Sequence, residues 1–219
     1  MEIPKTLQQK LDEGRQYRAV VDFRAPDAAD ERMIVEGYAT TFDQPYELFS
    51  DEDLVVMERV DRHAFDETDL SDVIMQYDHE GRVFARVKNG TLELESDGHG
   101  LRIRANLGGT EIGRQLFEEI QGGYTNKMSF GFTVAGERRQ RSKDGEGNTV
   151  VLRTITKIGK LFDVSAVSLP ANDATEISAR SIGDGLIAEA VKEIQAEEER
   201  ARKIGEIRKI LKGEQNHDE

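Results

Sequence analysis

The sequence predicts an α+β fold that is mainly β, with a barrel-like core and appended helices at both ends. Three observations support this class. Between Tyr17 and Thr156 the chain mostly alternates apolar and polar residues with a period of two, as half-buried strands do. One segment in that region has helical spacing instead, and the chain after Gly185 is rich in helix-forming residues. The predicted domains are an N-terminal helical arm over 1–16, a β-rich domain over 17–180 and a C-terminal helical extension over 181–219.

Short alternating runs predict most of the strands. They cover 19–24, 33–41, 54–60, 73–77, 83–87, 91–95 and 101–107. Asn89-Gly90 predicts a tight hairpin between two of these runs, and the segment 97–100 links the next pair, so that a three-strand meander results.

The second half of the core begins with a helix. Thr110 is a candidate N-cap for a helix that reaches Ile120, and Gly122-Gly123 ends it. The segments 127–134 and 149–156 then predict a hairpin whose polar insert, 136–148, forms a long mobile tip with several basic residues. A last apolar strand covers 162–169 and should close the barrel-like part before Pro170.

Composition excludes several classes of protein. The 219 residues carry a net charge of -13 and include no Cys, which excludes disulfides, thiolate metal sites and a cysteine nucleophile. No apolar run approaches the ~18 residues that a membrane helix needs, so we expect no membrane partner. A pI of about 4.9 disfavours nucleic acid as a partner.

The acidic residues concentrate in one stretch. Residues 43–72 hold eleven Asp and Glu against Arg59 and Arg62. A solvated loop is the expected interpretation, because the stretch lacks the regular ligand spacing of a calcium loop. A metal-dependent hydrolase built on this stretch is a remote alternative, and we expect neither a metal nor an organic cofactor.

Five residues are candidates for chemistry. His79 follows a predicted buried strand, where a side chain can face a cleft. Ser129 shares a strand face with Gly131, opposite three apolar residues, and a Gly there indicates an open patch that a substrate strand could approach. Asp163 is a carboxylate in an apolar strand and needs a partner, either a backbone amide, an Arg or an imidazole. His63 and His99 are weaker candidates in turns, while His217 lies in a charged tail.

Several segments taken together carry a resemblance that no single one carries alone. They are 58–65, 77–80, 90–92, 97–101, 127–132 and 163–172. In this order they resemble the prohead maturation proteases of tailed phages, over residues 35–174. That family is similar in fold to the herpesvirus assembly proteases, which implies a closed or partly closed barrel of about seven strands wrapped by helices. The strand count from periodicity agrees with this expectation.

The resemblance implies a serine endopeptidase with Ser129 as nucleophile and His79 as general base. Asp163 occupies the position of the acidic third member in the phage enzymes; His63 or His99 would fill it in the herpesvirus manner, and a third member could also be lacking. The oxyanion donors are not located by the sequence, and backbone amides near 136–148, Arg138 or Arg139 are candidates.

The resemblance also implies a biological setting. The substrates would be the capsid protein with its scaffolding segment and the protease itself, inside the immature prohead in the host cytoplasm. The terminal helices would dock to scaffold or capsid, or be self-cleaved tails, and self-association would raise a low intrinsic activity. The alternative is a non-enzymatic β-rich scaffold or capsid accessory protein, in which Ser129 and His79 are ordinary residues.

Overall fold

The computed structural model describes residues 9, 13–21, 23–24, 33–51, 54–167, 200 and 202–204. The chain divides into two compact units, Met1–Ala179 and Arg180–Glu219, and the fold and the candidate site belong to the first. Gln9, Arg200 and residues 202–204 are helical. Of the predicted N-terminal helical arm, residues 13–14 form a turn and residues 15–16 belong to a strand, so the helix does not extend to residue 16. The other residues of the predicted terminal helices lie outside the described residues, and so does His217.

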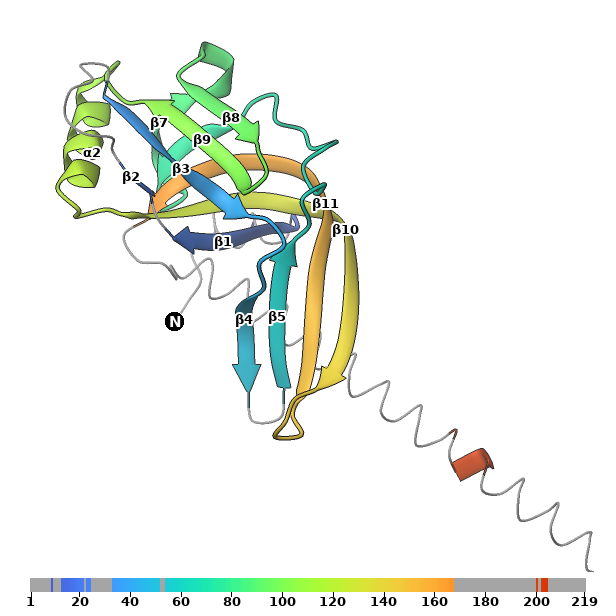
Figure 1. The fold of residues 1–219 in the computed structure, drawn as a ribbon. Helices are drawn as coiled ribbons and strands as arrows, with labels where there is room; N and C mark the ends of the chain where they lie inside the picture. Colours follow the sequence, from blue (N-terminus) through green and yellow to red (C-terminus); the bar gives the residue numbers. More distant parts are fainter. Residues whose placement is uncertain are drawn as a thin grey trace, which may run out of the picture. The chain divides into compact units, whose positions relative to one another are not determined.

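Two β-sheets form the described part of the first unit (Figure 1). The larger sheet has the strand order β1-β10-β11-β5-β4, with β6 paired to β11 and β7 paired to β6. Its strands are β1 (Arg15–Val21), β4 (Tyr46–Asp51), β5 (Leu54–Val60), β6 (Ile74–Tyr77), β7 (Glu80–Arg86), β10 (Lys127–Lys143) and β11 (Thr149–Val167). The smaller sheet has the order β2-β3-β9-β8. Its strands are β2 (Phe23–Arg24), β3 (Ile34–Thr41), β8 (Leu92–Ser96) and β9 (Gly100–Asn106).

The hydrophobic core contains buried residues from both sheets and from the helix α2 (Glu111–Gln121). Thr110 caps this helix, since its side chain accepts a hydrogen bond from the backbone N–H of Gly113. Leu116, Phe117 and Ile120 are buried on one face of α2, as the helical spacing predicted. The helix and its N-cap are therefore confirmed, with bounds one residue away from those expected.

The β10–β11 hairpin is the longest element of the fold. Its strands run past each other from Lys127↔Val167 to Lys143↔Thr149, and register shifts interrupt the pairing between Gly131 and Glu137. Such irregularities bend strands, and both strands curve strongly between the upper part of the molecule and the lower end of the hairpin (Figure 1). β11 pairs in parallel with β5 along its first half and with β6 near its end. This strand therefore links most of the larger sheet.

Several expected elements are confirmed with small changes of boundary. They are the strands near 33–41, 54–60, 73–77, 83–87, 91–95 and 101–107, and the turn at 97–100 that joins β8 to β9. The predicted run 19–24 divides into β1 and β2, which belong to different sheets.

Four expectations about connections and strands are wrong. Asn89-Gly90 does turn the chain, but β7 pairs with β6 and β8 with β9, so the two flanking strands form neither a hairpin nor a meander. The insert 136–148 is mostly strand rather than a mobile tip, because cross-strand pairing continues to Lys143↔Thr149. The strands predicted at 149–156 and 162–169 are one strand, β11. Of the closed or partly closed barrel that was expected, the closed form is wrong, because the two sheets, as far as they are described, do not close into a barrel.

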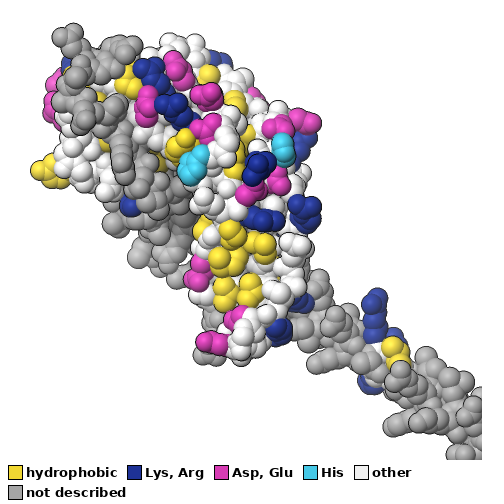
Figure 2. Space-filling model, viewed as in Figure 1, with side chains coloured by type: hydrophobic (Ala, Val, Ile, Leu, Met, Phe, Trp, Pro, Cys, Tyr) yellow, Lys and Arg dark blue, Asp and Glu magenta, His cyan; other side chains and the backbone are white. Residues whose placement is uncertain are grey.

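The acidic stretch 43–72 is only partly a solvated loop, since residues 61–72 are mostly turns with exposed or half-buried acidic side chains. It contains β4, which the alternation did not reveal, and β5. Many of its carboxylates form ion pairs, including Asp43 with Arg62 at 2.7 Å and Asp69 with Lys160 at 3.2 Å. Figure 2 shows basic side chains beside acidic ones on the viewed face. Within the described residues no group of three or more His, Cys, Asp or Glu has the arrangement of a metal site, and no helix is long and apolar enough to cross a membrane.

Glu58 of this stretch is fully buried in an ion cluster. Both of its oxygens accept hydrogen bonds from Arg18, and Arg153 donates to Oε2. The hydroxyl of Tyr46 donates to Oε1 at 2.5 Å. Burial alone would raise the pKa of Glu58, but the two guanidinium groups and Tyr46 outweigh it and lower the pKa to about 2. We call these four residues the Glu58 cluster.

Candidate active site

The first part of the site is a short stretch of β10. Met128, Phe130 and Phe132 point into the core and are at most 1% exposed. Because side chains alternate across a strand, Ser129 and Gly131 lie on the opposite face. The sequence predicted this division correctly.

The neighbouring strand β11 adds two polar side chains to the same face. Ser129 is opposite Ser165 and Gly131 is opposite Asp163 in the antiparallel register, and directly opposite residues lie on one face of a sheet. Ser165 donates a hydrogen bond from its hydroxyl to Asp163 Oδ1 at 2.8 Å. Ser165 was not among the residues expected in the site, although its spacing of two from Asp163 in a strand would have placed it there.

His79 reaches this face from a tight turn between β6 and β7. The turn consists of Asp78 and His79, whose φ angles are 48° and 61°, and Tyr77 pairs with Glu80 across it. Positive φ at both central residues is the requirement of a type I′ hairpin, in which Asn and Gly are usual. The N–H of Asp78 donates to the carbonyl of Ala166 at 2.9 Å. The turn is thus fixed to β11 beside Ser165, at a conformational cost of about 1–3 kcal/mol per strained residue.

Three side chains form a continuous series of hydrogen bonds. His79 Nε2 lies 2.7 Å from Ser129 Oγ, and His79 Nδ1 is hydrogen-bonded to Asp163 Oδ1. With Nδ1–H donating to the carboxylate, Nε2 is left to accept the serine proton. Ser129, His79 and Asp163 are 0%, 2% and 3% exposed. The carboxylate that looked costly in an apolar strand is therefore paired with an imidazole and a hydroxyl.

Tyr17 of β1 and Gly131 complete the surroundings of the histidine. The Tyr17 ring meets the His79 ring edge-on, with centroids 4.4 Å apart. A Cβ on Gly131 would lie 2.6 Å from Asp163 Oδ2 and 2.8 Å from Tyr17 Cε1, so only Gly leaves room for both. The open patch expected beside Ser129 is wrong, since Asp163 and Tyr17 fill the space above Gly131. Sequence periodicity could place Tyr17 on a strand, but not beside His79.

The Tyr17 side chain is buried, and its hydroxyl has no hydrogen-bond partner within the described residues. Burial, followed by the charge of Asp163, raises the pKa of Tyr17 to about 12. A neutral phenol is thus retained beside the carboxylate throughout the ordinary pH range.

Other expected candidates lie elsewhere. His63 is exposed and its Nδ1 lies 3.1 Å from Asp66 Oδ2, while the His99 ring stacks edge-on against Tyr38. Neither is the partner of His79 Nδ1, which is Asp163. Arg138 follows Ser129 by nine residues along β10, about 30 Å of extended strand. Arg139 pairs with Glu137 at 2.6 Å in the same part of the hairpin. The structure does not bring the two arginines to Ser129, so the expectation that they supply the oxyanion donors is not supported.

A serine hydroxyl, an imidazole and a carboxylate in this order are the arrangement of serine hydrolases, which recurs on unrelated folds. The model of the Caudovirus prohead serine protease family matches residues 19–186, and the chain belongs to this family of serine proteases. The family match covers the two strands that carry Ser129 and Asp163 and the turn that carries His79. It contradicts the alternative of a non-enzymatic accessory protein.

The solved structure of the bacteriophage T4 capsid assembly protease, gp21, is similar to this chain. The similarity covers 70% of this chain and 98% of the T4 protein, at 13% sequence identity and a TM-score of 0.38. No curated protein matches the chain.

Proposed function

We propose that Ser129 is the nucleophile of this prohead serine protease and that His79 is its general base. Asp163 would orient the imidazole of His79 and stabilise its protonated form. The observation that supports this assignment most strongly is the pair of hydrogen bonds on the two nitrogens of His79, one to Ser129 and one to Asp163. A serine hydroxyl is a weak nucleophile at neutral pH and needs a base within about 2.6–3.2 Å. The 2.7 Å contact satisfies that requirement.

The reaction follows from these positions. Ser129 Oγ attacks the carbonyl carbon of the scissile peptide bond as its proton passes to His79 Nε2, and the carbonyl oxygen becomes an oxyanion. When the C–N bond breaks, the imidazolium returns that proton to the departing amine and an acyl-enzyme remains. Water then donates a proton to His79 Nε2 and attacks the carbonyl carbon of the ester. When the bond from that carbon to Ser129 Oγ breaks, His79 returns the proton to Oγ, so that the acid is released and the hydroxyl and the neutral imidazole are restored. Asp163 stays ionised and stabilises the imidazolium in both steps.

Ser165 and Tyr17 support these three residues without touching the substrate bond. Ser165 donates to the oxygen of Asp163 that also accepts from His79, which fixes the orientation of the carboxylate. The Tyr17 ring limits rotation of the imidazole by its edge-on contact. Both are positioning residues in this proposal.

We infer further that the substrates are the capsid protein with its scaffolding segment and other copies of the protease. The family description, a prohead serine protease, supports this inference. The reaction would then take place inside the immature prohead in the host cytoplasm. The segments 1–16 and 181–219 would dock to scaffold or capsid or be removed by self-cleavage, and the part between them would be the protease domain.

The test compares the parent chain with Ser129→Ala at high protein concentration, with the intact mass of each followed over time. We expect the parent to form fragments and the variant to form none. Loss of the nucleophile should lower the rate of cleavage by about 10⁶. The fragment masses identify the self-cleavage sites. Co-expression with the capsid protein measures trimming of the scaffolding segment in the same pair of chains.

Ser142→Ala is the matched control, because Ser142 is an exposed serine at the far end of the same strand. It should leave both activities unchanged. Equal fragmentation in Ser129→Ala and the parent would contradict the assignment of the nucleophile. If neither chain cuts, a serine-directed phosphonate decides the matter, since failure to label Ser129 would contradict the proposal as well.

A further inference from the structure

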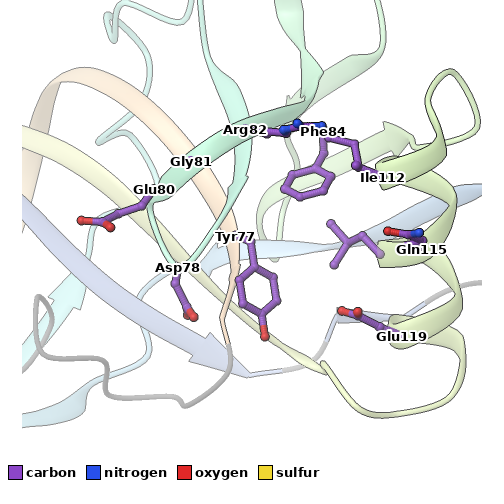
Figure 3. Close-up of a pocket in the computed structure, with 10 residues that line it drawn as sticks. Tyr77, Asp78, Glu80, Gly81, Arg82, Phe84, Ile112, Gln115 and Glu119 are labelled. Carbon is purple, nitrogen blue, oxygen red and sulfur yellow. The ribbon is translucent and has the colours of Figure 1, made fainter.

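A cavity of about 650 Å³ lies beside the turn that carries His79. Its walls come from the end of β6, the first part of β7 and one face of α2 (Figure 3). The lining residues are Tyr77, Asp78, Glu80, Gly81, Arg82, Phe84, Ile112, Gln115, Leu116 and Glu119. None of the residues assigned to catalysis or positioning above is among them.

The cavity is adjacent to the general base along the chain. Asp78 and Glu80 line it, and they are the residues immediately before and after His79. Consecutive Cα atoms are 3.8 Å apart, and an extended peptide advances about 3.3–3.6 Å per residue. A substrate whose scissile bond meets Ser129 can therefore place a side chain in the cavity only a few residues from that bond.

An edge strand borders the cavity. Within the described residues β7 pairs with β6 alone, and its residues from Glu80 to Val83 are exposed. Unpaired backbone groups at a sheet edge can pair with an extended peptide, and pockets along that edge then accept alternate side chains. The backbone of β7 is thus suited to hold a substrate segment over the cavity.

The lining has an apolar floor and an acidic mouth. Tyr77, Phe84 and Leu116 supply the floor, with Leu116 buried. In Figure 3 Asp78, the Tyr77 hydroxyl and Glu119 lie along the same side of the cavity, whereas Arg82 lies on the opposite side near Phe84. Glu80 points away from the cavity in this view.

We propose, on the basis of the function proposed above, that this cavity is a specificity subsite that accepts a lysine or arginine side chain of the cleaved protein. The aliphatic stem of such a side chain would cover the apolar floor while its cationic end meets Asp78 and Glu119 at the mouth. An acidic substrate side chain would meet like charges there and be rejected. Glu119, which is on α2 and takes no part in the hydrogen bonds of the proposed catalytic residues, is the specificity-determining residue that mutation can address.

The experiment begins with the peptides of a digested bacterial proteome, incubated with the full-length parent chain and separately with Ser129→Ala. Mass spectrometry of the new termini gives the residues on both sides of each bond that is cut only by the parent. We expect Lys and Arg to be enriched at one fixed position within about four residues of that bond. The most frequent sequence is then synthesised with Lys, Gln or Glu at this position, and kcat and KM are measured for each peptide.

Glu119→Gln should lower kcat/KM for the Lys peptide by about 3–10-fold, mainly through KM, and leave the Gln peptide unchanged. Glu119→Lys should shift the preference toward the Glu peptide. Glu118→Gln is the matched control, because Glu118 is the preceding exposed residue of α2 and does not line the cavity. It should have no effect on any of the three peptides.

Three results would overturn the inference, and they separate failure of the subsite from failure of the mechanism. Cuts that depend on Ser129 but show no basic residue at any fixed position would contradict the subsite and leave the protease mechanism intact. So would equal losses for the Lys and Gln peptides in Glu119→Gln. The absence of any cut that depends on Ser129, together with failure of the serine-directed phosphonate to label Ser129, would instead contradict the proposed mechanism, and the subsite with it.

Discussion

Two adjacent residues of β1 contact two different buried polar clusters. Tyr17 packs against His79 on the face that carries Ser129 and Asp163, whereas Arg18 points to the other face and binds Glu58. Each cluster contains a carboxylate that is at most 3% exposed. The two carboxylates differ in their partners, since Asp163 faces an imidazole and a hydroxyl while Glu58 faces two guanidinium groups and a phenol.

This difference determines what each cluster can do. A guanidinium group does not lose its proton in a protein, so the Glu58 cluster holds fixed charges and can contribute only to structure. An imidazole accepts and releases a proton near neutral pH, so the cluster around His79 can move one. Burial of a carboxylate therefore indicates neither stability nor catalysis until its partners are known.

The largest expected difference between the clusters comes from Asp163→Asn. The neutral amide cannot stabilise the imidazolium and favours the wrong tautomer of His79, so kcat should fall by about 10³–10⁴. The free energy of unfolding should change by only about 1 kcal/mol, since the side chain keeps its size. Peptide cleavage and urea unfolding measure the two quantities. A large loss of stability with unchanged kcat would assign Asp163 to structure instead.

Glu58→Gln should show the opposite pattern. Removing the charge leaves Arg18 buried without its carboxylate, and breaking a buried ion pair in this way costs about 3–5 kcal/mol. The kcat of the folded fraction should remain near that of the parent. Glu95→Gln, at an exposed carboxylate, is the control and should change stability by at most about 0.5 kcal/mol. Loss of kcat in fully folded Glu58→Gln would show that the two clusters are coupled through β1.

Acid should unfold the protein through the Glu58 cluster. The folded pKa of Glu58, about 2, is lower than its ordinary value of 4.5. Its contribution is therefore complete above about pH 4.5 and is lost as the pH falls toward 2, for a total of about 3 kcal/mol. Thermal unfolding followed between pH 6 and pH 2 measures the loss. Glu58→Gln should have a shallower dependence in this window, and identical curves for the two chains would exclude Glu58 as the cause.

Gly131→Ala, on β10, tests how tightly Asp163 and the Tyr17 ring are packed beside His79. The added methyl group would meet Asp163 Oδ2 and the Tyr17 ring, so one of them must move. A shift of the order of 1 Å in an orienting group lowers kcat by about 10–100-fold. Gly145→Ala, where an added Cβ meets nothing within 4 Å, should have no effect. Unchanged kcat in Gly131→Ala would show that the carboxylate position is not critical.

The sequence predicted the elements whose period was clear and failed where pairing depends on distant strands. Alternation located β3, β5 and β9, and the cap at Thr110 located α2. It could not distinguish a turn that joins paired strands from one that joins two sheets, which is why Asn89-Gly90 was misinterpreted. Alternation did not predict β4, because the strand contains charged residues. Its pairing with β5 also has a register shift at Leu48, which interrupts the alternation.

The candidate site was predicted from three residues that are far apart in the chain, and the structure brings all three together. That expectation rested on resemblance, because no local pattern indicates that a residue at 79 meets residues at 129 and 163. The period of two in a strand could have predicted Ser165 in the site, because it places Ser165 on the same face as Asp163. Tyr17 and the left-handed turn at Asp78 and His79 were not, since both depend on how β1 and β6 pair with other strands.

The position of β11 in the sheet determines when a newly synthesised chain can first become an active protease. This strand carries Asp163, and it pairs with β10, β5 and β6. It is also the last described strand to leave the ribosome, which adds about 5–20 residues per second. A nascent chain therefore contains Ser129 and His79 for several seconds before the sheet that joins them can form. We therefore expect no peptide cleavage by a nascent chain before β11 has been added to it.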